Sequence, residues 1–373
     1  MALGNFSGFG IPSISLKIRP LEYGYSNARV RGMKGLLLSK DTYDNLLNFE
    51  TTEEMIEFLQ KTHYKTHLLD AAAIYTGSRV IESASGKHYA AIASKIKKIA
   101  PKADKDIIDA LLAKWDVINL KLVIVSKRYT KEFSDIQPSI VAAGSLSEDD
   151  LKKIYNAGER DVFNEIRRTR FGRELFSQSA QMNQDMLRSF RKALTSMDNY
   201  SQIQAILDTY GYILIEKFLG KYLADGDVRK IYHLLQAEID VLNLSTIERL
   251  KNAGITNPEK IRSYLIEGGT LRADLTALID SKDLSASLPI FKRKFSGFDL
   301  EGVNTVVAFE IAIQKALAAK KLAVFHGTIF SVGTLLGFLL LKEEEMNNLR
   351  KIAKGKEFGI SKEDLMKSLL IGR

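Results

Sequence analysis

Apolar residues recur every three or four positions along much of the chain, which is the spacing of one face of an α-helix. One such stripe consists of Ile206, Leu207, Tyr210, Ile213 and Leu214. Thr51 and Glu54 form a capping box directly before an apolar run, which predicts a helix beginning there. No proline occurs between positions 139 and 257, and proline interrupts helices. We therefore expect an all-α fold.

One apolar stretch is long enough to cross a membrane. Leu322–Leu341 has twenty residues and no charge if His326 is neutral, and a transmembrane helix needs about twenty apolar residues. The stretch also contains three glycines, two threonines and a serine, and Glu343–Glu345 follows almost at once. A helix that is apolar on all sides can equally be the buried core helix of a bundle. We favour a single core helix here over a membrane span.

A short pattern occurs three times. Asp116–Leu120 matches Asp240–Leu244, and Glu345–Leu349 is a weaker third copy. Each copy is followed by a helix start that a glycine introduces, at 144–151, 269–275 and 359–365. This order predicts three related helical lobes.

Each copy carries an asparagine three positions after its acidic residue, so both lie on one helix face. These asparagines are Asn119, Asn243 and Asn348. An asparagine in an apolar helix most often binds a neighbouring backbone group. We favour that role over direct contact with a partner.

The chain lacks the residues of the common catalytic and metal sites. It has no cysteine, which excludes disulfides, thiolate nucleophiles and zinc–thiolate centres. His63 and His67 would share one face of a helix, but no third ligand is evident and the glutamate of a metalloprotease helix is missing. No phosphate-binding loop or nucleophile elbow is present. We expect no catalytic residue, cofactor or metal.

The charged runs have ordinary explanations. We interpret Glu148–Asp150 as charges at a helix start and Glu343–Glu345 as charges on a solvated face. Nearby carboxylates can pair with a cluster of arginines, so a charged helix face is favoured over a nucleic-acid site. The arginines are Arg160, Arg167, Arg168, Arg170 and Arg173.

Basic residues outnumber acidic ones. The chain of 373 residues has 54 Lys and Arg against 45 Asp and Glu, a formal net charge of +9. Such a surface can attract nucleic acid, anionic lipid or an acidic protein. Residues 1–20 do not have the pattern of a signal peptide and are expected to form a loose extension.

Two terminal blocks resemble a known family. Tyr23–Ser39 reads YGYSNARVRGMKGLLLS, with Tyr25 before the N-A-R-x-R segment Asn27–Arg31. Lys342–Ser361 reads KEEEMNNLRKIAKGKEFGIS. In this order they are similar to the C subunits of the archaeal-type (A-type or V-type) rotary ATP synthases, the counterparts of the d subunit in the vacuolar enzyme.

The resemblance implies a non-catalytic rotor component of the central stalk. It implies three helical lobes arranged as a pseudo-threefold funnel, peripheral on the cytoplasmic face of the membrane. Its partners would be the D and F subunits of the central shaft and the proteolipid ring, with anionic headgroups as a further contact and no nucleic acid. It would transmit torque for ATP synthesis or ATP-driven ion transport. A basic scaffold that binds nucleic acid is the alternative.

These expectations divide the chain into an extension at 1–20 and lobes at 21–157, 158–277 and 278–373. The residues expected at the interface with partners are Tyr23, Asn27, Arg29, Arg31, Glu345, Asn348 and Arg350. For the residues of the first helix, packing against the lobes is the alternative role.

Overall fold

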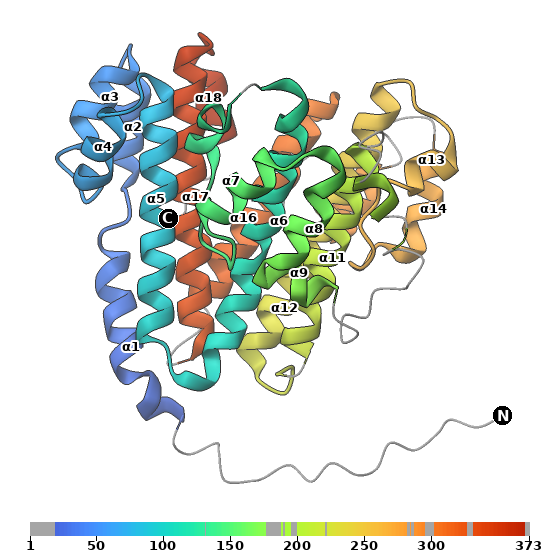
Figure 1. Ribbon diagram of the computed structural model, residues 1–373, viewed down its shortest axis with the longest axis horizontal. Coiled ribbons are helices and arrows are strands. Elements are labelled where there is room, and N and C mark those ends of the chain that lie inside the picture. The colour runs from blue at the N-terminus through green and yellow to red at the C-terminus, as the bar shows by residue number, and fades with distance from the viewer. Residues whose placement is uncertain are drawn as a thin grey trace.

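The computed structural model describes residues 19–130, 132–176, 188, 191–194, 200–220, 222–281, 284, 287–294, 302–326 and 331–369. Within these ranges the secondary structure is helical, without strands, so the predicted all-α fold is confirmed (Figure 1). The α-helices are α1 (Arg19–Lys34), α2 (Lys40–Asn48), α3 (Thr52–Leu59), α4 (Lys65–Ala72), α5 (Ser78–Ile99), α6 (Lys105–Tyr129), α7 (Glu148–Asn156), α8 (Val162–Arg168), α9 (Arg170–Leu175), α11 (Tyr200–Gly220), α12 (Gly226–Asn252), α13 (Pro258–Arg262), α14 (Arg272–Asp280), α15 (Ser287–Lys294), α16 (Val306–His326), α17 (Val332–Glu357) and α18 (Lys362–Ser368). Short 3₁₀ turns lie at Lys102–Asp104, Phe133–Asp135, Gln137–Ser139 and Glu159–Asp161.

Side-chain caps begin several of the helices. The predicted capping box is confirmed, because Thr51 accepts a bond from the Glu54 amide and Glu54 accepts one in return from the amide of Thr51. Ser147 caps α7 in the same way with Asp150. Each cap satisfies amide groups that the first helical turn leaves without a partner.

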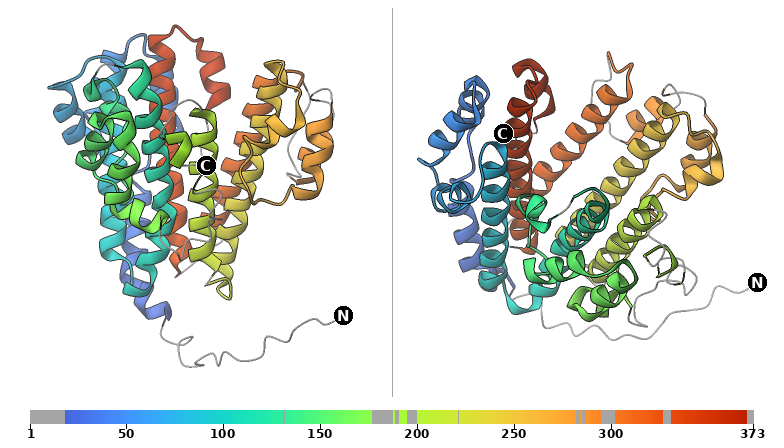
Figure 2. Two further views of the ribbon diagram at one scale, coloured as in Figure 1. Left: turned by 45° about the vertical axis from the view of Figure 1, so that its right-hand side comes forward. Right: turned by 45° about the horizontal axis from the view of Figure 1, so that its top comes forward.

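Six long helices form three packed pairs. Helix α6 packs along α11, α12 along α16, and α17 along α5. Figures 1 and 2 show that α6, α12 and α17 run in one direction and that their partners run in the other. One continuous apolar core contains buried residues from all six helices, such as Leu111, Ile215, Val241, Phe309 and Leu336. The short helices pack around these pairs.

Helix α17 is buried on nearly all sides. It contacts α1, α3, α5, α12, α16 and α18, and every residue from Val332 to Leu340 is buried. The prediction of a single core helix over Leu322–Leu341 is wrong, because α16 ends at His326 and α17 begins at Val332. Among the described residues, none of the helices combines the length and apolar character needed to traverse a bilayer.

The three-lobed arrangement of the chain is not decided by the helix pairs. The funnel and the lobe boundaries stay predictions. Most of the predicted extension at 1–20 lies outside the described residues, and α1 begins at Arg19.

Candidate functional site

The first copy of the repeated pattern holds a loop against α6. Asp116 accepts bonds from the amides of Ser145 and Leu146, both at 2.8 Å, and from the Ser145 hydroxyl at 2.9 Å. Asn119 donates to the Val141 carbonyl at 2.8 Å and accepts from the Val141 amide at 3.1 Å. These bonds fix the loop directly before α7.

The second copy repeats this arrangement on α12. Asp240 accepts bonds from the amides of Thr270 and Leu271, at 2.8 and 3.1 Å, and from the Thr270 hydroxyl at 2.6 Å. Asn243 exchanges two bonds with the backbone of Ile266, at 2.8 and 2.9 Å. The predicted backbone-binding role of the asparagines is therefore confirmed for Asn119 and Asn243.

The glycine in each of these loops has a steric reason. A Cβ atom on Gly144 would lie 2.3 Å from the Asp116 carboxylate, and one on Gly269 would lie 2.3 Å from that of Asp240. Gly269 also has a φ of +71°, a conformation that favours glycine. The loops can approach their carboxylates only because no side chain intervenes.

The third copy takes its loop from the other end of the chain. Glu345 accepts a bond at 2.6 Å from the amide of Leu38, which lies directly before the cap of α2. The glycine-led segment at 359–365 is the predicted helix start, since it forms the turn into α18, which Ser361 caps. It is not, however, the loop that Glu345 binds. Asn348 is buried like its counterparts.

A lysine eleven positions after each acidic residue completes the repeat. Lys127 donates to the carbonyls of Tyr155 and Ala157 at the end of α7. Lys251 donates to the Leu278 carbonyl near the end of α14. Lys356 donates to the carbonyls of Leu47 and Phe49 at the end of α2.

Each long helix therefore grips a short helix at both ends. Helices α7, α14 and α2 all have nine residues. A carboxylate lies at the amino end of each and an ammonium at its carboxyl end, which matches the sign of the helix dipole. We call this arrangement the helix clamp. Its lysines were not predicted, although their equal spacing is readable in the sequence.

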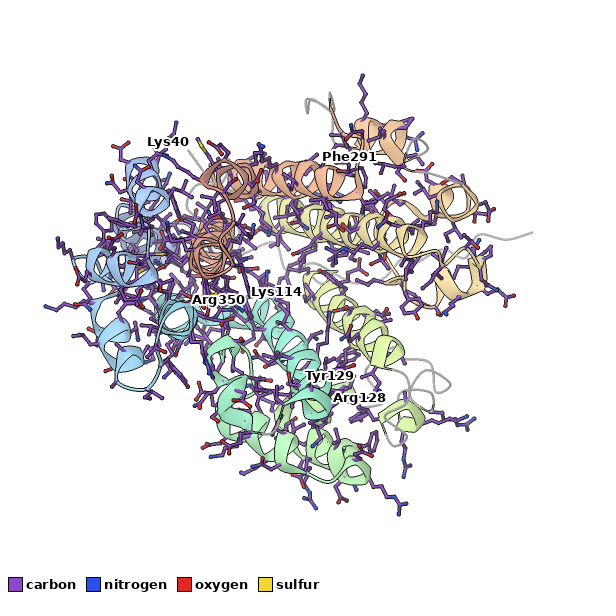
Figure 3. The ribbon with its side chains drawn as sticks, turned by 90° about the horizontal axis from the view of Figure 1, so that it is seen from above. Lys40, Lys114, Arg128, Tyr129, Phe291 and Arg350 are labelled. Carbon is purple, nitrogen blue, oxygen red and sulfur yellow. The ribbon has the colours of Figure 1, made fainter. Side chains whose placement is uncertain are left out.

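Buried ion pairs join α17 to neighbouring helices. The ammonium of Lys114 on α6 lies 2.5 Å from Glu343, and that of Lys321 on α16 lies 2.7 Å from Glu344. Arg350 reaches α5 by donating to the Glu82 carbonyl at 2.9 Å. Figure 3 looks along α17 and labels Arg350 on this helix and Lys114 on the neighbouring α6.

The prediction that Glu343–Glu345 form a solvated face is wrong. All three glutamates are buried. Burial by itself raises the pKa of Glu344, but Lys321 outweighs this effect and the pKa is lowered. Burial likewise opposes ionisation of Glu345, yet bonds from His63, Lys342 and Tyr64 lower its pKa to about 2. Glu344 and Glu345 are therefore charged structural groups.

An aromatic cluster lies next to Glu345. The Tyr64 hydroxyl donates to Glu345 at 2.6 Å, and the Tyr64 ring lies 4.5 Å from the ring of His88 on α5. His63 belongs to the turn before α4 and His67 to α4 itself, so the two histidines do not share a helix. Among the described residues, no group of three or more His, Asp or Glu has the geometry of a metal site.

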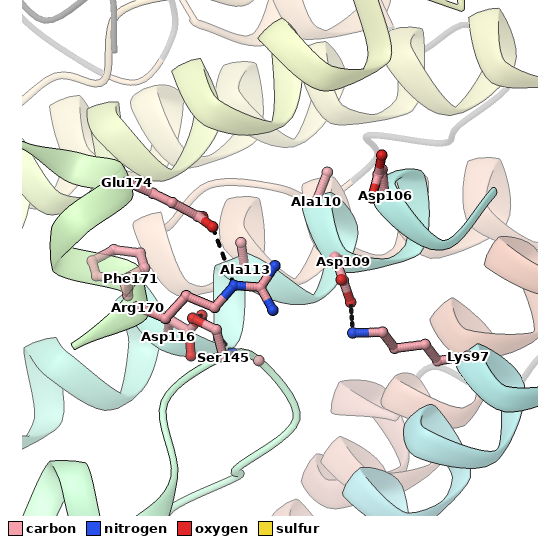
Figure 4. A pocket seen from close by; sticks show the side chains of 11 residues that line it. Lys97, Asp106, Asp109, Ala110, Ala113, Asp116, Ser145, Arg170, Phe171 and Glu174 are labelled. Carbon is pink, nitrogen blue, oxygen red and sulfur yellow. Dashed lines mark hydrogen bonds and ion pairs between the residues drawn. The ribbon is translucent and has the colours of Figure 1, made fainter. Parts of the chain in front are cut away.

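A small pocket of about 90 Å³ lies between α5, α6 and α9 (Figure 4). Two ion pairs line it, Lys97 with Asp109 at 2.5 Å and Arg170 with Glu174 at 3.2 Å. Asp116 also lines it, and burial raises the pKa of this carboxyl. Because Asp116 already binds the loop before α7, the pocket offers a structural carboxylate rather than a poised general base.

The residues predicted at an interface occupy two kinds of position. On α1, Tyr23 and Asn27 are buried, whereas Arg29 and Arg31 are exposed. The Tyr23 hydroxyl donates to Asp104, which agrees with the packing alternative for this residue. Glu345, Asn348 and Arg350 belong to the interior around α17, with Arg350 partly buried. Their interface role stays a prediction.

The arginine cluster of α8 and α9 has acidic neighbours, as expected. Arg168 pairs with Glu165 and Arg170 with Glu174, while all five arginines of the cluster are exposed. Exposed pairs of this kind contribute little to stability. The arrangement agrees with the prediction of a charged helix face.

Comparison with known proteins points to one family. The model of the ATP synthase (C/AC39) subunit family matches residues 26–368. The C subunit of the A-type ATP synthase of Methanosarcina mazei is 26% identical over 354 residues, covering 94% of this chain and 93% of its own. That of Methanosarcina acetivorans is 27% identical over 360 residues, covering 94% and 92%. That of a Desulfurococcus species is 27% identical over 365 residues, covering 95% and 92%.

Proposed function

The chain belongs to the ATP synthase (C/AC39) subunit family, and on this premise we propose that it is the non-catalytic rotor component in the central stalk of an A/V-type ATP synthase. In this role it connects a shaft of D and F subunits to the proteolipid ring on the cytoplasmic face of the membrane. Torque then passes through it for ATP synthesis or ATP-driven ion transport. The match to the family over residues 26–368 is the observation that carries the proposal.

The interior supports a mechanical role. Transmission of torque requires a body that resists shear between its helices rather than a reactive group. Buried ion pairs tie α17 to α6 and α16, and Arg350 ties it to α5. Breaking a buried pair costs about 3–5 kcal/mol, so sliding α17 past these helices is strongly disfavoured.

We propose the exposed face of α1 as part of the interface with the shaft. Tyr25 is 64% exposed, and Arg29 lies one helical turn further along. Arg31 and Leu36 are also exposed near this end of the helix. Tyrosine and arginine are enriched at the residues that dominate protein interfaces. Of the four interface residues predicted on α1, Tyr23 and Asn27 are buried within the chain, whereas Arg29 and Arg31 are exposed and can contact a partner.

Reversal of both exposed charges tests this interface. The variant Arg29→Glu/Arg31→Glu should bind a purified D–F shaft at least ten-fold more weakly, because two cations become anions within the contact. Binding is measured by biolayer interferometry, with circular dichroism to show that the fold is retained. Arg160→Glu/Arg167→Glu is the control, since it makes the same change of charge on exposed residues of another surface. Equal affinities of the two variants would reject α1 as the shaft contact.

The basic excess supports a second contact, with the membrane side of the complex. Each Lys or Arg near an anionic surface contributes about 1 kcal/mol, and this attraction fades within a Debye length. Association with anionic lipid vesicles or with a ring-containing membrane should therefore weaken several-fold between roughly 50 and 300 mM salt, the range over which screening shortens that length. Co-sedimentation measures this, and binding that is independent of salt would contradict it.

A further inference from the structure

His88 is a buried histidine beneath the turn that joins α3 to α4. Its ring centroid lies 4.9 Å from that of His63, 4.5 Å from that of Tyr64 and 5.4 Å from that of His67. The residue is 8% exposed and its Nε2 atom has no hydrogen-bond partner. Two residues of this turn and one of α4 thus cover an imidazole that belongs to α5.

The surroundings of His88 disfavour a second positive charge. The Lys342 ammonium on α17 lies 3.0 Å from the Nε2 atom of His63. The same nitrogen lies 3.7 Å from a carboxylate oxygen of Glu345, which also accepts a bond from the Lys342 ammonium. Lys342 also lies 4.7 Å from the centre of the Tyr64 ring. The covering turn is therefore packed around one cation.

Charged and titratable groups face the cluster from every element packed against it. Among the described groups whose charge acts on His88, Glu345 is the one anion. The Glu345 carboxylate already accepts bonds from Lys342, Tyr64 and the Leu38 amide. Burial is the main cause that lowers the pKa of His88 to about 2, with Lys342 and the neighbouring histidines adding to it. The groups concerned are Lys342 and Glu345 on α17, His63, Tyr64, His67 and Asp70 from the turn and α4, Lys87 on α5, and Tyr43 on α2.

We propose that acidification loosens the α3–α4 turn from α5 and α17, because His88 can take up a proton only after the turn moves away. Movement of the turn also removes the Tyr64 bond to Glu345, the residue that holds Leu38 in the third helix clamp. A proton at this position thereby weakens the contact between the amino-terminal helices and α17. The cluster acts as a pH-sensitive latch at this junction.

The coupling between proton uptake by His88 and opening of the turn predicts how strongly opening depends on pH. A histidine in water has a pKa of about 6.5, whereas the packed turn keeps His88 neutral. Between about pH 7.5 and 5.5 the opening equilibrium of the turn should therefore rise about ten-fold for one proton taken up.

Hydrogen exchange measured by mass spectrometry tests this on the full chain. Amides of residues 60–72, which form the turn and α4, are followed at both pH values, and rates are corrected for the intrinsic effect of pH on exchange. The native chain should lose protection about ten-fold in this segment, while amides within α12 stay unchanged. His88→Gln and His88→Phe should abolish the dependence on pH, because neither side chain titrates. His233→Gln is the control, since His233 is an exposed histidine on α12.

The test is decided by the ratio of the corrected exchange rates at the two pH values. A variant that is less protected at both pH values therefore remains informative. A ten-fold loss that persists in both His88 variants would overturn the proposal. An equal loss of protection in α12 would overturn it as well, since opening would then be global. Because the experiment needs only this chain, the result is independent of the proposed rotor function.

Discussion

The pair between Lys321 and Glu344 shows what a single buried contact does in this molecule. Both side chains are nearly inaccessible, and their charged atoms lie 2.7 Å apart between α16 and α17. Removing two charges from water is costly, and their attraction repays this only when both are present. We therefore expect the pair to fix the register of the two helices more than it adds stability.

Removing one charge of the pair should destabilise the fold much more than removing both charges. Lys321→Met leaves Glu344 buried and unpaired, and we expect the free energy of unfolding to fall by about 3–5 kcal/mol. The double variant Lys321→Met/Glu344→Leu removes both charges and should recover most of the loss. Urea titrations followed by circular dichroism measure both values. A double variant no more stable than the single one would show that packing, rather than charge, dominates here.

Predictions about single residues succeeded where the type of residue and its position in an apolar stripe determine the type of partner. A polar residue within an apolar stripe must find a backbone partner, and Asn119 and Asn243 do so. Glu343 and Glu344 were placed on the surface instead, because their partners Lys114 and Lys321 look like solvent-facing lysines in the sequence. A pairing between residues far apart in the chain leaves no periodic pattern.

At the scale of elements, the helix clamp explains how three short helices are held. A nine-residue helix is too short to be stable alone in water. The clamp adds charged hydrogen bonds at both ends, from Asp116 and Lys127 in the first copy, for example. The stability of α2, α7 and α14 therefore depends on the long helix beside each.

Loss of a clamp lysine should loosen one short helix. Lys356→Met removes the charged bonds to the Leu47 and Phe49 carbonyls, and bonds of this type contribute about 1.5–3 kcal/mol. The free energy of unfolding should fall by this amount, and amides of α2 should exchange faster. Lys354→Met on the same helix is the control, because its pair with Glu82 is half-exposed and contributes about 0–1 kcal/mol. Equal effects of the two changes would contradict the clamp.

Boundaries between elements were harder to predict than their type. The apolar run Leu322–Leu341 indicated burial correctly, since α17 is enclosed from Val332 to Leu340. Hydropathy does not show where a buried chain reverses direction, however. Residues on both sides of the reversal face the same core, so the run appeared to be one helix.

At the scale of the whole molecule, the third helix pair combines the two ends of the chain. Helix α17 packs along α5, and a separate apolar cluster joins residues such as Leu46, Met55 and Ile81 to Leu349 and Ile352. A search for repeats reads the chain in order, so it assigned the segment at 359–365 to Glu345. The loop that Glu345 holds is at Leu38, 307 residues earlier.

A circular permutant tests this closure. If residues 1 and 373 are joined by a flexible linker and the chain is opened at Pro101 between α5 and α6, all three helix pairs become contiguous. We expect the permuted chain to keep its helical content and cooperative unfolding, within about 2 kcal/mol of the original, because loop closure depends only weakly on length. Opening at Val123 within α6 is the control and should prevent folding. Failure of both chains would argue against the third pair as a unit.

The pairing of α5 with α17 has a consequence for biosynthesis. More than 200 residues separate the end of α5 at Ile99 from the beginning of α17 at Val332, and ribosomes add about 5–20 residues per second. The apolar surface of the first helices therefore lacks its contact with α17 for roughly 10–50 seconds, while the rest of the polypeptide is translated. During that interval we expect apolar side chains of this cluster, such as Leu46, Met55 and Ile81, to be less covered than in the folded chain, which favours aggregation of the nascent segment.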